Sequence, residues 1–238
     1  MSMKKLLTLL ALTLCITACN KNNADLITIN EIVNVRNGLL INDAGVRYNL
    51  SDSDMMSQIM SLDRIFIIGQ IEPASSPSYD YKLYLMQFIG VNVKDCIKSS
   101  EITDDDALGH DPLHLSTCWL DGGYINASLA FSYNTYMGYQ GVANIVFDQT
   151  RSTSQDLYFV LRNNQNGKTW ANEDLTPSEL EFGTGIYSFK YTPLLDPSYK
   201  GDINFHFEWV WFQNDPSNEN VPLRTTEIRS ETFTLKAE

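Results

Sequence analysis

The three histidines are the first place to look for chemistry in this chain of 238 residues. His110 and His114 stand four residues apart, which on a helix would turn two metal-ligating imidazoles to one face. Pro112 lies between them and is not tolerated in a helix interior. We therefore expect a loop with exposed imidazoles, and a metal site is the alternative. The nearby run Asp104–Asp106 lacks the ligand spacing and the glycine of a calcium-binding loop.

The third histidine, His206, lies in a run of alternating aromatic and polar residues that ends at Phe212. In a strand, this alternation places His206 and Glu208 on one face and the aromatic side chains on the other. The pair could act as an acid–base couple of a hydrolase. We expect instead a solvent-facing strand surface opposite a buried aromatic face. The chain contains no G-x-S-x-G motif and no glycine-rich phosphate loop, so we predict no catalytic residue, metal or cofactor.

Three tyrosines, Tyr133, Tyr136 and Tyr139, cluster close to Gly138 and Gly141. Tyrosine joins a large apolar area to a polar tip, so exposed tyrosines can stack on sugars or anchor a protein partner. The same side chains are also ordinary material for the core or edge of a β-sandwich. The cluster is therefore either a recognition patch or packing, and the sequence leaves both possibilities open.

The elements that must position these side chains follow an N-terminal export signal. Lys4 and Lys5 precede the apolar run Leu6–Ile16, and the small residues Thr17-Ala18 lead to Cys19. A basic start, a short apolar stretch and small residues are the parts of a bacterial secretory signal. The apolar run is about half the length that a membrane-spanning helix needs.

A cysteine directly after Ile16-Thr17-Ala18 resembles a bacterial lipobox. The resemblance implies that residues 1–18 are a removable signal peptide and that Cys19 is acylated, which anchors the chain to a lipid bilayer. Residues 19–25 then form a flexible tether. Asn20, where aspartate would signal retention, favours the outer membrane by the enteric sorting rule. The face of that membrane stays open.

Two further cysteines, Cys96 and Cys118, remain in the exported part of the chain. A pair of cysteines in an exported protein is a plausible disulfide. Two buried free thiols are an equally good interpretation. The sequence contains no C-x-x-C motif that would support a zinc site or a redox centre.

From residue 26 onward, the pattern is one of short β-rich runs separated by turn residues. Residues 26–100 hold about five such runs, which suits a small barrel of the OB type. Asn37-Gly38 predicts a tight hairpin turn, because both turn positions need a positive φ. The segment from Ser51 to Leu62 is the one helix-like piece.

Residues 101–112 combine acidic residues with glycine and proline, which is typical of an interdomain linker. Residues 113–238 contain seven or more short strands, and this number fits an immunoglobulin-like or related β-sandwich. The predicted fold class is therefore all-β, with an OB-like barrel followed by a sandwich. The 29 acidic and 17 basic residues give a net charge of −12, which repels nucleic-acid backbones and argues against nucleic-acid partners.

With this organisation, the chain resembles the NigD-like lipoproteins of Bacteroidetes-type bacteria. The resemblance is carried by three stretches: GHDPLHLSTCWLDGGYIN at Gly109–Asn126, DRIFIIGQIEP at Asp63–Pro73, and LYFVLRNNQNG at Leu157–Gly167. It implies an OB-like domain, a C-terminal sandwich and a role that has been proposed to be bacteriocin immunity. It brings no catalytic residues.

We therefore expect a non-catalytic envelope lipoprotein that binds an unidentified envelope protein, as an immunity or accessory factor. The alternative is a surface lipoprotein that binds a glycan through the tyrosine cluster. A hydrolase built around His206 is a third possibility.

Overall fold

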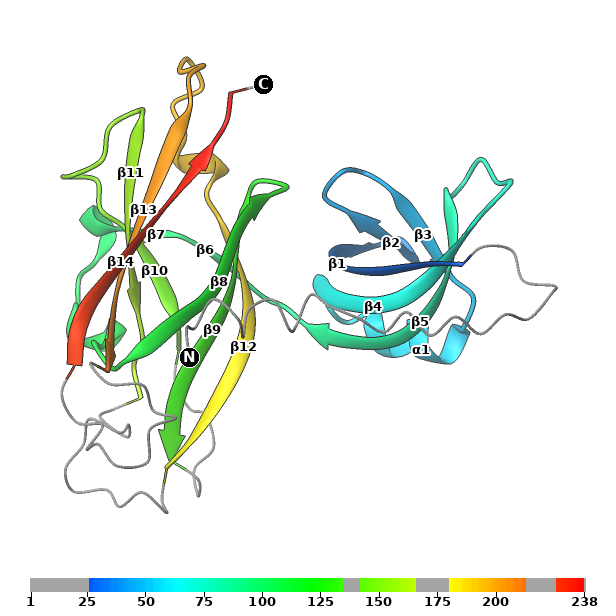
Figure 1. Cartoon of the computed structure of the whole chain (residues 1–238), viewed down its shortest axis with the longest axis horizontal. Coiled ribbons are helices and arrows are strands. Elements are labelled where there is room, and N and C mark those ends of the chain that lie inside the picture. The colour runs from blue at the N-terminus through cyan, green and yellow to red at the C-terminus, as the bar shows by residue number, and fades with distance from the viewer. Residues whose placement is uncertain (1–25, 135–141, 166–179, 213–225, 238) are drawn as a thin grey trace, which may run out of the picture.

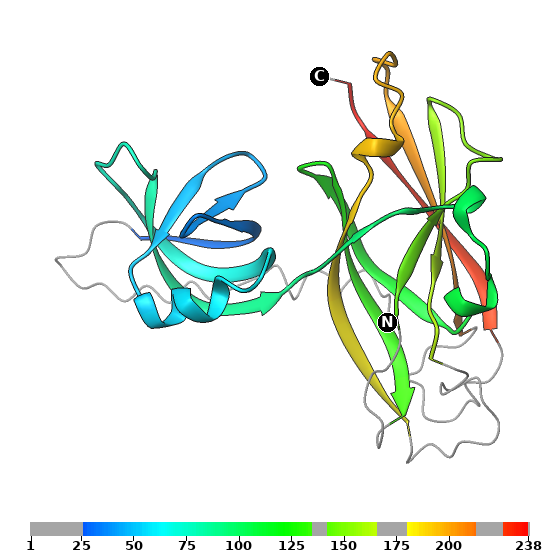
Figure 2. The same cartoon turned by 180° about the vertical axis from the view of Figure 1, so that it is seen from behind.

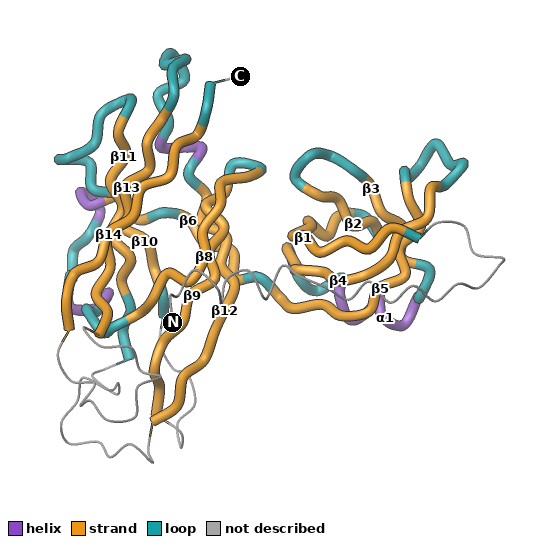
Figure 3. The backbone as a smooth tube through the Cα atoms, viewed as in Figure 1, coloured by secondary structure: helices purple, strands orange, loops and turns teal. Residues whose placement is uncertain are grey.

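The computed structural model describes residues 26–134, 142–165, 180–212 and 226–237, which form two β-domains (Figure 1). Nearly all regular structure is strand, as the orange segments of Figure 3 show, and α1 (Ser53–Ile59) is the one α-helix among the described residues. The predicted all-β class is confirmed. Cys19 and the predicted signal and tether lie outside the described residues.

The N-terminal domain is a closed barrel of five strands. The strands are β1 (Ile27–Arg36), β2 (Leu39–Asn42), β3 (Arg47–Leu50), β4 (Arg64–Pro73) and β5 (Tyr81–Gly90). They neighbour one another in the order β1-β2-β3-β5-β4, and β1 pairs with β4 to close the barrel. The β3–β5 pair is parallel and the other four pairs are antiparallel. With α1 between β3 and β4, this is the arrangement of an OB fold.

Local sequence accounts for much of this barrel. Asn37 and Gly38 both have positive φ values, 51° and 78°, so the predicted hairpin turn joins β1 to β2. The side chain of Asp52 accepts hydrogen bonds from two backbone N–H groups of the first turn of α1 and so begins this helix. Apolar side chains that alternate along the strands fill the barrel, among them the fully buried Val33 and Ile67.

The C-terminal domain is a sandwich of two sheets. One sheet has the order β14-β13-β11-β10-β7 and the other has the order β6-β12-β9-β8. Their strands are β6 (Asn92–Asp95), β7 (Ile97–Lys98), β8 (Leu113–Asp121), β9 (Tyr124–Asn134), β10 (Asn144–Phe147), β11 (Asp156–Arg162), β12 (Leu180–Lys190), β13 (Ile203–Phe212) and β14 (Thr226–Leu235). In the described part of this domain, short 3-10 helices at Ser99–Glu101, Asp106–Leu108 and Thr192–Leu194 lie between strands.

The aromatic face predicted for β13 forms the middle of the sandwich core. Phe205 and Phe207 are buried, and both stack on Phe159 of β11 with ring centroids 5.7 and 5.4 Å apart. Trp209 and Trp211 continue the same buried face. The alternation of aromatic and polar residues along β13 therefore correctly predicted which side chains face the core and which face outward.

The junction between the domains lies at Val91, and not at residue 100, where the predicted barrel domain ended before the expected acidic linker. β6 pairs in parallel with β12, and β7 pairs in parallel with β10, so residues 92–98 belong to the sandwich. Figure 2 shows the chain passing directly from β5 of the barrel into β6 of the sandwich. The backbone N–H of Val91 donates to the carbonyl of Arg64, which ties this one-residue connection to the barrel.

The segment 101–112, which the sequence analysis predicted to be an interdomain linker, is instead bound to the sandwich. The Arg162 guanidinium at the end of β11 donates to the carbonyl of Gly109 at 2.7 Å and to the carboxylate of Asp105 at 2.9 Å. The N–H of Asp111 donates to the carbonyl of Asn163. The acidic residues therefore hold the segment against the sandwich, because a largely buried arginine draws carboxylates and carbonyls to itself. Over the described residues, no helix is long and apolar enough to span a bilayer.

Candidate functional site at the domain seam

The two domains meet where the β8–β9 hairpin of the sandwich points at the barrel (Figure 1). The turn of this hairpin contains Gly122, whose φ is +56°. A Cβ atom on Gly122 would collide with the side chain of Asp43, which follows β2 in the barrel. Only glycine combines this backbone conformation with so close an approach. The hairpin tip is therefore shaped to fit the barrel.

Arg64, the first residue of β4, forms the polar centre of this contact. Its guanidinium makes a two-pronged ion pair with Asp43, with N–O distances of 2.7 and 2.5 Å. It also donates to the side-chain oxygen of Asn34 at 2.8 Å. The side chains of Arg64 and Asp43 are only 1% and 5% exposed. A bidentate pair of this kind is the strong form of an ion pair, and here it is shielded from water.

The sandwich completes the coordination of Arg64. Its Nε donates to Ser188 Oγ at 3.2 Å, and its Nη2 donates to Asn126 Oδ1 at 3.3 Å. Ser188 in turn donates to Asn126 Oδ1 at 2.6 Å. The ring of Tyr124 lies 4.1 Å from the guanidinium carbon, in cation–π contact. Because one buried cation is shared by both domains, the seam fixes how the barrel and the sandwich are joined.

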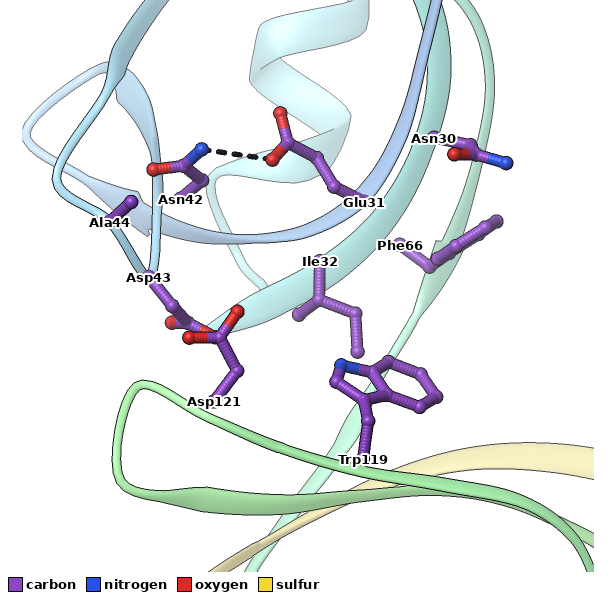
Figure 4. Close-up of a pocket in the computed structure, with 9 residues that line it drawn as sticks. All are labelled: Asn30, Glu31, Ile32, Asn42, Asp43, Ala44, Phe66, Trp119 and Asp121. Carbon is purple, nitrogen blue, oxygen red and sulfur yellow. Dashed lines mark hydrogen bonds between the residues drawn. The ribbon is translucent and has the colours of Figure 1, made fainter. Parts of the chain in front are cut away.

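Beside this network is a cleft of about 180 Å³, which we call the seam cleft (Figure 4). The residues that matter most in its lining are Glu31, Ile32, Asp43 and Phe66 of the barrel and Trp119 and Asp121 of the sandwich. Figure 4 shows the Trp119 ring beside Ile32 and the Glu31 carboxylate facing Asn42. Glu31 and Ile32 are neighbours on β1 and point to opposite faces, so the Glu31 carboxylate faces the barrel interior while Ile32 faces Trp119 of the sandwich.

The carboxylates beside the seam cleft differ in their partners. Asp43 is neutralised by Arg64. One Glu31 oxygen accepts a hydrogen bond of 2.9 Å from Asn42, whereas the other is buried without a hydrogen-bond partner among the described residues. Burial, followed by the nearby Glu31 carboxylate, raises the pKa of Tyr48 above its usual range, so this tyrosine stays neutral. Asp121 is exposed at the hairpin tip.

The sequence-predicted histidines are not brought together. His114 lies on β8, where its ring stacks on Trp211 at 5.3 Å, so its predicted place in a linker is wrong. His110 remains exposed and contacts Asp105 and Arg162. Among the described residues, no group of three or more His, Cys, Asp or Glu side chains is arranged to hold a metal ion.

His206 and Glu208 share the outer face of β13 as predicted, but each has another partner. The ring of His206 lies 2.9 Å from Asp156 and 4.4 Å from the stacked ring of Tyr158. Glu208 forms an ion pair with Arg151 at 2.8 Å. The two residues belong to a paired polar surface of the five-stranded sheet.

The two cysteines are free thiols in the structure, so the possible disulfide is not formed. Cys96 directly follows β6 and Cys118 lies on β8, and these strands are at opposite edges of the four-stranded sheet. Three strand spacings separate them, roughly 14 Å, whereas a disulfide needs Cα atoms within about 7 Å.

The possible tyrosine patch lies largely outside the described residues. The backbone of Tyr133 pairs with Glu181 at one end of the β9–β12 ladder. The side chain of Tyr133, as well as Tyr136 and Tyr139, falls outside the described part of the chain.

The sequence analysis did not identify Arg64 as a site residue. A single charged residue at the beginning of an apolar strand looks like an ordinary solvent-exposed strand end. A signal was nevertheless present. Of the stretches that carry the family resemblance, one contains Arg64 and another contains Trp119, Asp121, Tyr124 and Asn126. These two stretches meet at the seam.

No protein-family model matches the sequence, and no curated protein matches it. Solved structures do match. A NigD-like immunity protein from Bacteroides caccae is 19% identical, with 91% of this chain and 100% of that chain covered and a TM-score of 0.60. A protein of unknown function from Bacteroides vulgatus is 15% identical, with 89% and 92% covered and a TM-score of 0.59. A predicted lipoprotein from Bacteroides fragilis is 12% identical, with 89% and 99% covered and a TM-score of 0.57. The resemblance to NigD-like proteins is thus confirmed in the fold.

Proposed function

We propose that this protein is a lipid-anchored protein of the bacterial outer membrane that binds another envelope protein, as an immunity or accessory factor, and is not an enzyme. The lipobox-like sequence that ends at Cys19 supports the anchor. The shared fold with a NigD-like immunity protein and with a predicted lipoprotein supports the role.

The observation that carries a binding role is the seam cleft. Trp119 is 36% exposed there, although tryptophan has a large apolar surface that is usually well buried. Exposed tryptophans next to apolar and charged neighbours are typical centres of protein–protein interfaces. The Arg64 network holds both walls of the cleft in place, so binding there needs little ordering of the domains.

The imidazole of His206, the candidate catalytic side chain, makes hydrogen bonds and a ring contact on the outer face of the five-stranded sheet. His206 contacts Asp156 and Thr232 through its two ring nitrogens, and its ring is covered by Tyr158. These contacts favour a structural role for the imidazole. On this view, replacing His206 leaves the function unchanged.

The binding role is tested by mild cross-linking in native membranes, followed by capture through a C-terminal tag and identification of proteins and sugars. We expect one protein partner in stoichiometric amount, and the Trp119→Ala variant should reduce its recovery. Tyr158→Ala, which removes an aromatic ring from the polar sheet face, is the matched control. Recovery of a polysaccharide with no protein would contradict the proposal and favour the glycan-binding alternative.

The anchor is tested separately. Metabolic labelling with a fatty acid should mark the wild-type chain, which should sediment with outer membranes. The Cys19→Ser variant should lose both the label and the membrane association. Labelling of Cys19→Ser, or sedimentation with inner membranes, would contradict the proposed anchor.

A further inference from the structure

We propose that the barrel rests on the lipid surface through the outer face of β4 and β5, which we call the β4–β5 face. This face carries apolar and aromatic side chains on both strands: Phe66, Ile68, Tyr84, Met86 and Ile89. The inference rests on the proposed lipid anchor and adds the orientation that the barrel takes on the bilayer. It follows from the exposure of these side chains, a β-bulge, the charge of the face and the position of the anchor.

The side chains of the β4–β5 face point away from the barrel core. Residues of β4 alternate between the core and the outside, so Phe66 and Ile68 point outward. Ile89 pairs with Phe66 across the two strands and therefore shares its face. Tyr84 and Ile89 are each 44% exposed, and Met86 is 69% exposed. A connected apolar surface of this kind is typical of a site that contacts a protein or a membrane.

A β-bulge turns one additional side chain toward this face. Ile68 pairs with Gln87, but the next residue of β4, Gly69, pairs with Leu85, so Met86 is the extra residue of the bulge. Gly69 permits this shift, because a Cβ atom there would lie only 2.8 Å from the carbonyl oxygen of Tyr84. The exposure of Met86 is therefore fixed by the strand pairing.

The β4–β5 face is electrically neutral, although the protein is strongly acidic. Its outward positions from Phe66 to Glu72 and from Lys82 to Ile89 hold one acidic and one basic residue, and these two, Glu72 and Lys82, lie opposite each other. The whole chain carries a net charge of −12. A bilayer that contains anionic lipids repels such a chain, and the repulsion is smallest where the protein surface is neutral. The charge distribution therefore favours this face for contact with lipid.

Tyr84 joins the apolar part of the face to its polar end. Its hydroxyl donates a hydrogen bond of 2.8 Å to a carboxylate oxygen of Glu72, while its ring is exposed. Tyrosine is enriched at membrane–water interfaces, because its ring is apolar and its hydroxyl is polar. The position of Tyr84 suits the boundary between lipid and water.

The proposed anchor brings the β4–β5 face to the bilayer. The chain from Cys19 to Ile27, the first residue of β1, spans at most about 30 Å. Ile27 pairs with Ile71 of β4, which pairs with Leu83 of β5, the residue before Tyr84. The start of β1 is thus two strand spacings, about 10 Å, from this face. Because an acyl anchor so close raises the local concentration of lipid, a weak apolar contact is enough to orient the barrel.

The direct test uses the protein purified from membranes and reconstituted into vesicles of phosphatidylethanolamine and phosphatidylglycerol. Gln87→Cys carries a fluorescent label on the β4–β5 face. Leu39→Cys carries the same label on the outward side of β2, a strand that neighbours neither β4 nor β5. The wild type, whose Cys96 and Cys118 are largely buried, gives the background of labelling.

Lipids with a nitroxide on the acyl chain report which label contacts the bilayer. We expect them to quench the Gln87→Cys label about threefold more strongly than the Leu39→Cys label, because only the first lies against lipid. Dissolved iodide should show the opposite preference.

Two double variants in the Gln87→Cys background identify the side chains that hold the face to lipid. Met86→Glu with Ile89→Glu should reduce the quenching by lipid about threefold, because two carboxylates must then approach anionic lipid. Val142→Glu with Ile228→Glu adds the same charge at exposed apolar positions of the sandwich and should leave the quenching unchanged. Thermal unfolding curves confirm that all variants are folded.

Four outcomes would overturn the inference. The first is equal quenching of the two labels, which would mean that the barrel has no preferred face toward lipid. The second is equal loss of quenching in both double variants, which would mean only general charge repulsion. The third is protection of the Gln87→Cys label from iodide without vesicles, in a Cys19→Ser chain, which would mean that a second copy covers the face. The fourth is protection in native membranes but not in vesicles, which would assign the face to a partner protein.

The vesicle experiment separates this inference from the proposed function. Protein that floats with the vesicles and shows selective quenching agrees with both the anchor and the docking face. Protein that floats without selective quenching keeps the anchor and overturns the docking face. If the protein does not float, the anchor fails. A hexahistidine tag in place of Cys19 and a nickel-chelating lipid then hold the chain at the vesicle, and the same comparison of labels decides whether the face contacts lipid.

Discussion

Arg64 and Ser188 lie 124 positions apart in sequence, yet the Nε of Arg64 donates a hydrogen bond of 3.2 Å to Ser188 Oγ. Arg64 belongs to the barrel and Ser188 to the sandwich, and both side chains are buried. The same guanidinium neutralises Asp43. The guanidinium that neutralises Asp43 in the barrel thus also donates hydrogen bonds to the other domain.

Replacing Arg64 should therefore strongly destabilise the protein. Arg64→Met leaves the Asp43 carboxylate buried without its cation, which costs about 3–5 kcal/mol of the free energy of unfolding. Urea unfolding followed by fluorescence measures this loss. Adding Asp43→Asn should recover much of it, because the orphaned charge is then removed.

The matched control is Lys98→Met, which breaks an exposed pair with Glu101. Exposed pairs contribute at most about 1 kcal/mol. A similar loss in Lys98→Met and Arg64→Met would contradict the central role of the seam network.

The close approach of Gly122 to Asp43 predicts a second effect. Gly122→Ala should cost more than the roughly 1–2 kcal/mol that a left-handed backbone costs an alanine, because the new methyl group also displaces Asp43. Gly38→Ala is the control: its φ of +78° is also positive, but no atom lies within 4 Å of the new methyl group. Calorimetry of both variants gives the comparison, and equal losses would show that the seam tolerates the methyl group.

The free thiols predict low reactivity. Burial raises the pKa of Cys118 to about 12 and raises the pKa of Cys96 as well. Since the thiolate is the reactive form, alkylation of Cys118 at pH 8 should be on the order of a thousandfold slower in the folded protein than in urea. Peptide mapping after alkylation in urea without reductant should find both cysteines labelled. A Cys96–Cys118 disulfide in that map would contradict the strand order.

The contact between His206 and Asp156 on the outer face of β13 predicts that the stability of the protein depends on pH. The hydrogen bond from His206 is the largest cause that holds the pKa of Asp156 below its ordinary value of about 3.9. Because folding lowers this pKa, the stabilisation is present above pH 3.9 and is lost as the pH falls through the folded-state pKa. His206→Asn should raise the pKa of Asp156 in an NMR titration. The pKa of Asp148, lowered chiefly by Thr150, should stay constant.

The features that sequence predicted best are local ones. The alternation along β13, the Asn37-Gly38 turn and the position of α1 each depend on neighbours within a few residues. The number of short strands then indicated a barrel and a sandwich.

The predictions that were wrong concern contacts between residues far apart in the sequence. β6 and β7 contain four and two residues, and their partners lie far along the chain, so nothing near residue 92 marks the start of the second domain. The acidic segment 101–112 resembled a solvated linker because Arg162, which binds it, is more than 50 positions away. Arg64 escaped notice for the same reason, since its partners Asn126 and Ser188 are not neighbours in sequence.

The position of β6 also sets the order in which the chain acquires its structure. As the polypeptide emerges from its N-terminus, the barrel has all its strands once Gly90 is available. β6 follows immediately, but the first residue of its partner segment on β12, Tyr187, comes 95 residues after Asn92. A strand edge that waits this long is open to wrong pairing. A chain that emerges N-terminus first would therefore pass through a stage with a finished barrel and an unpaired β6, and Arg64 would meet Asn126 well before Ser188 becomes available.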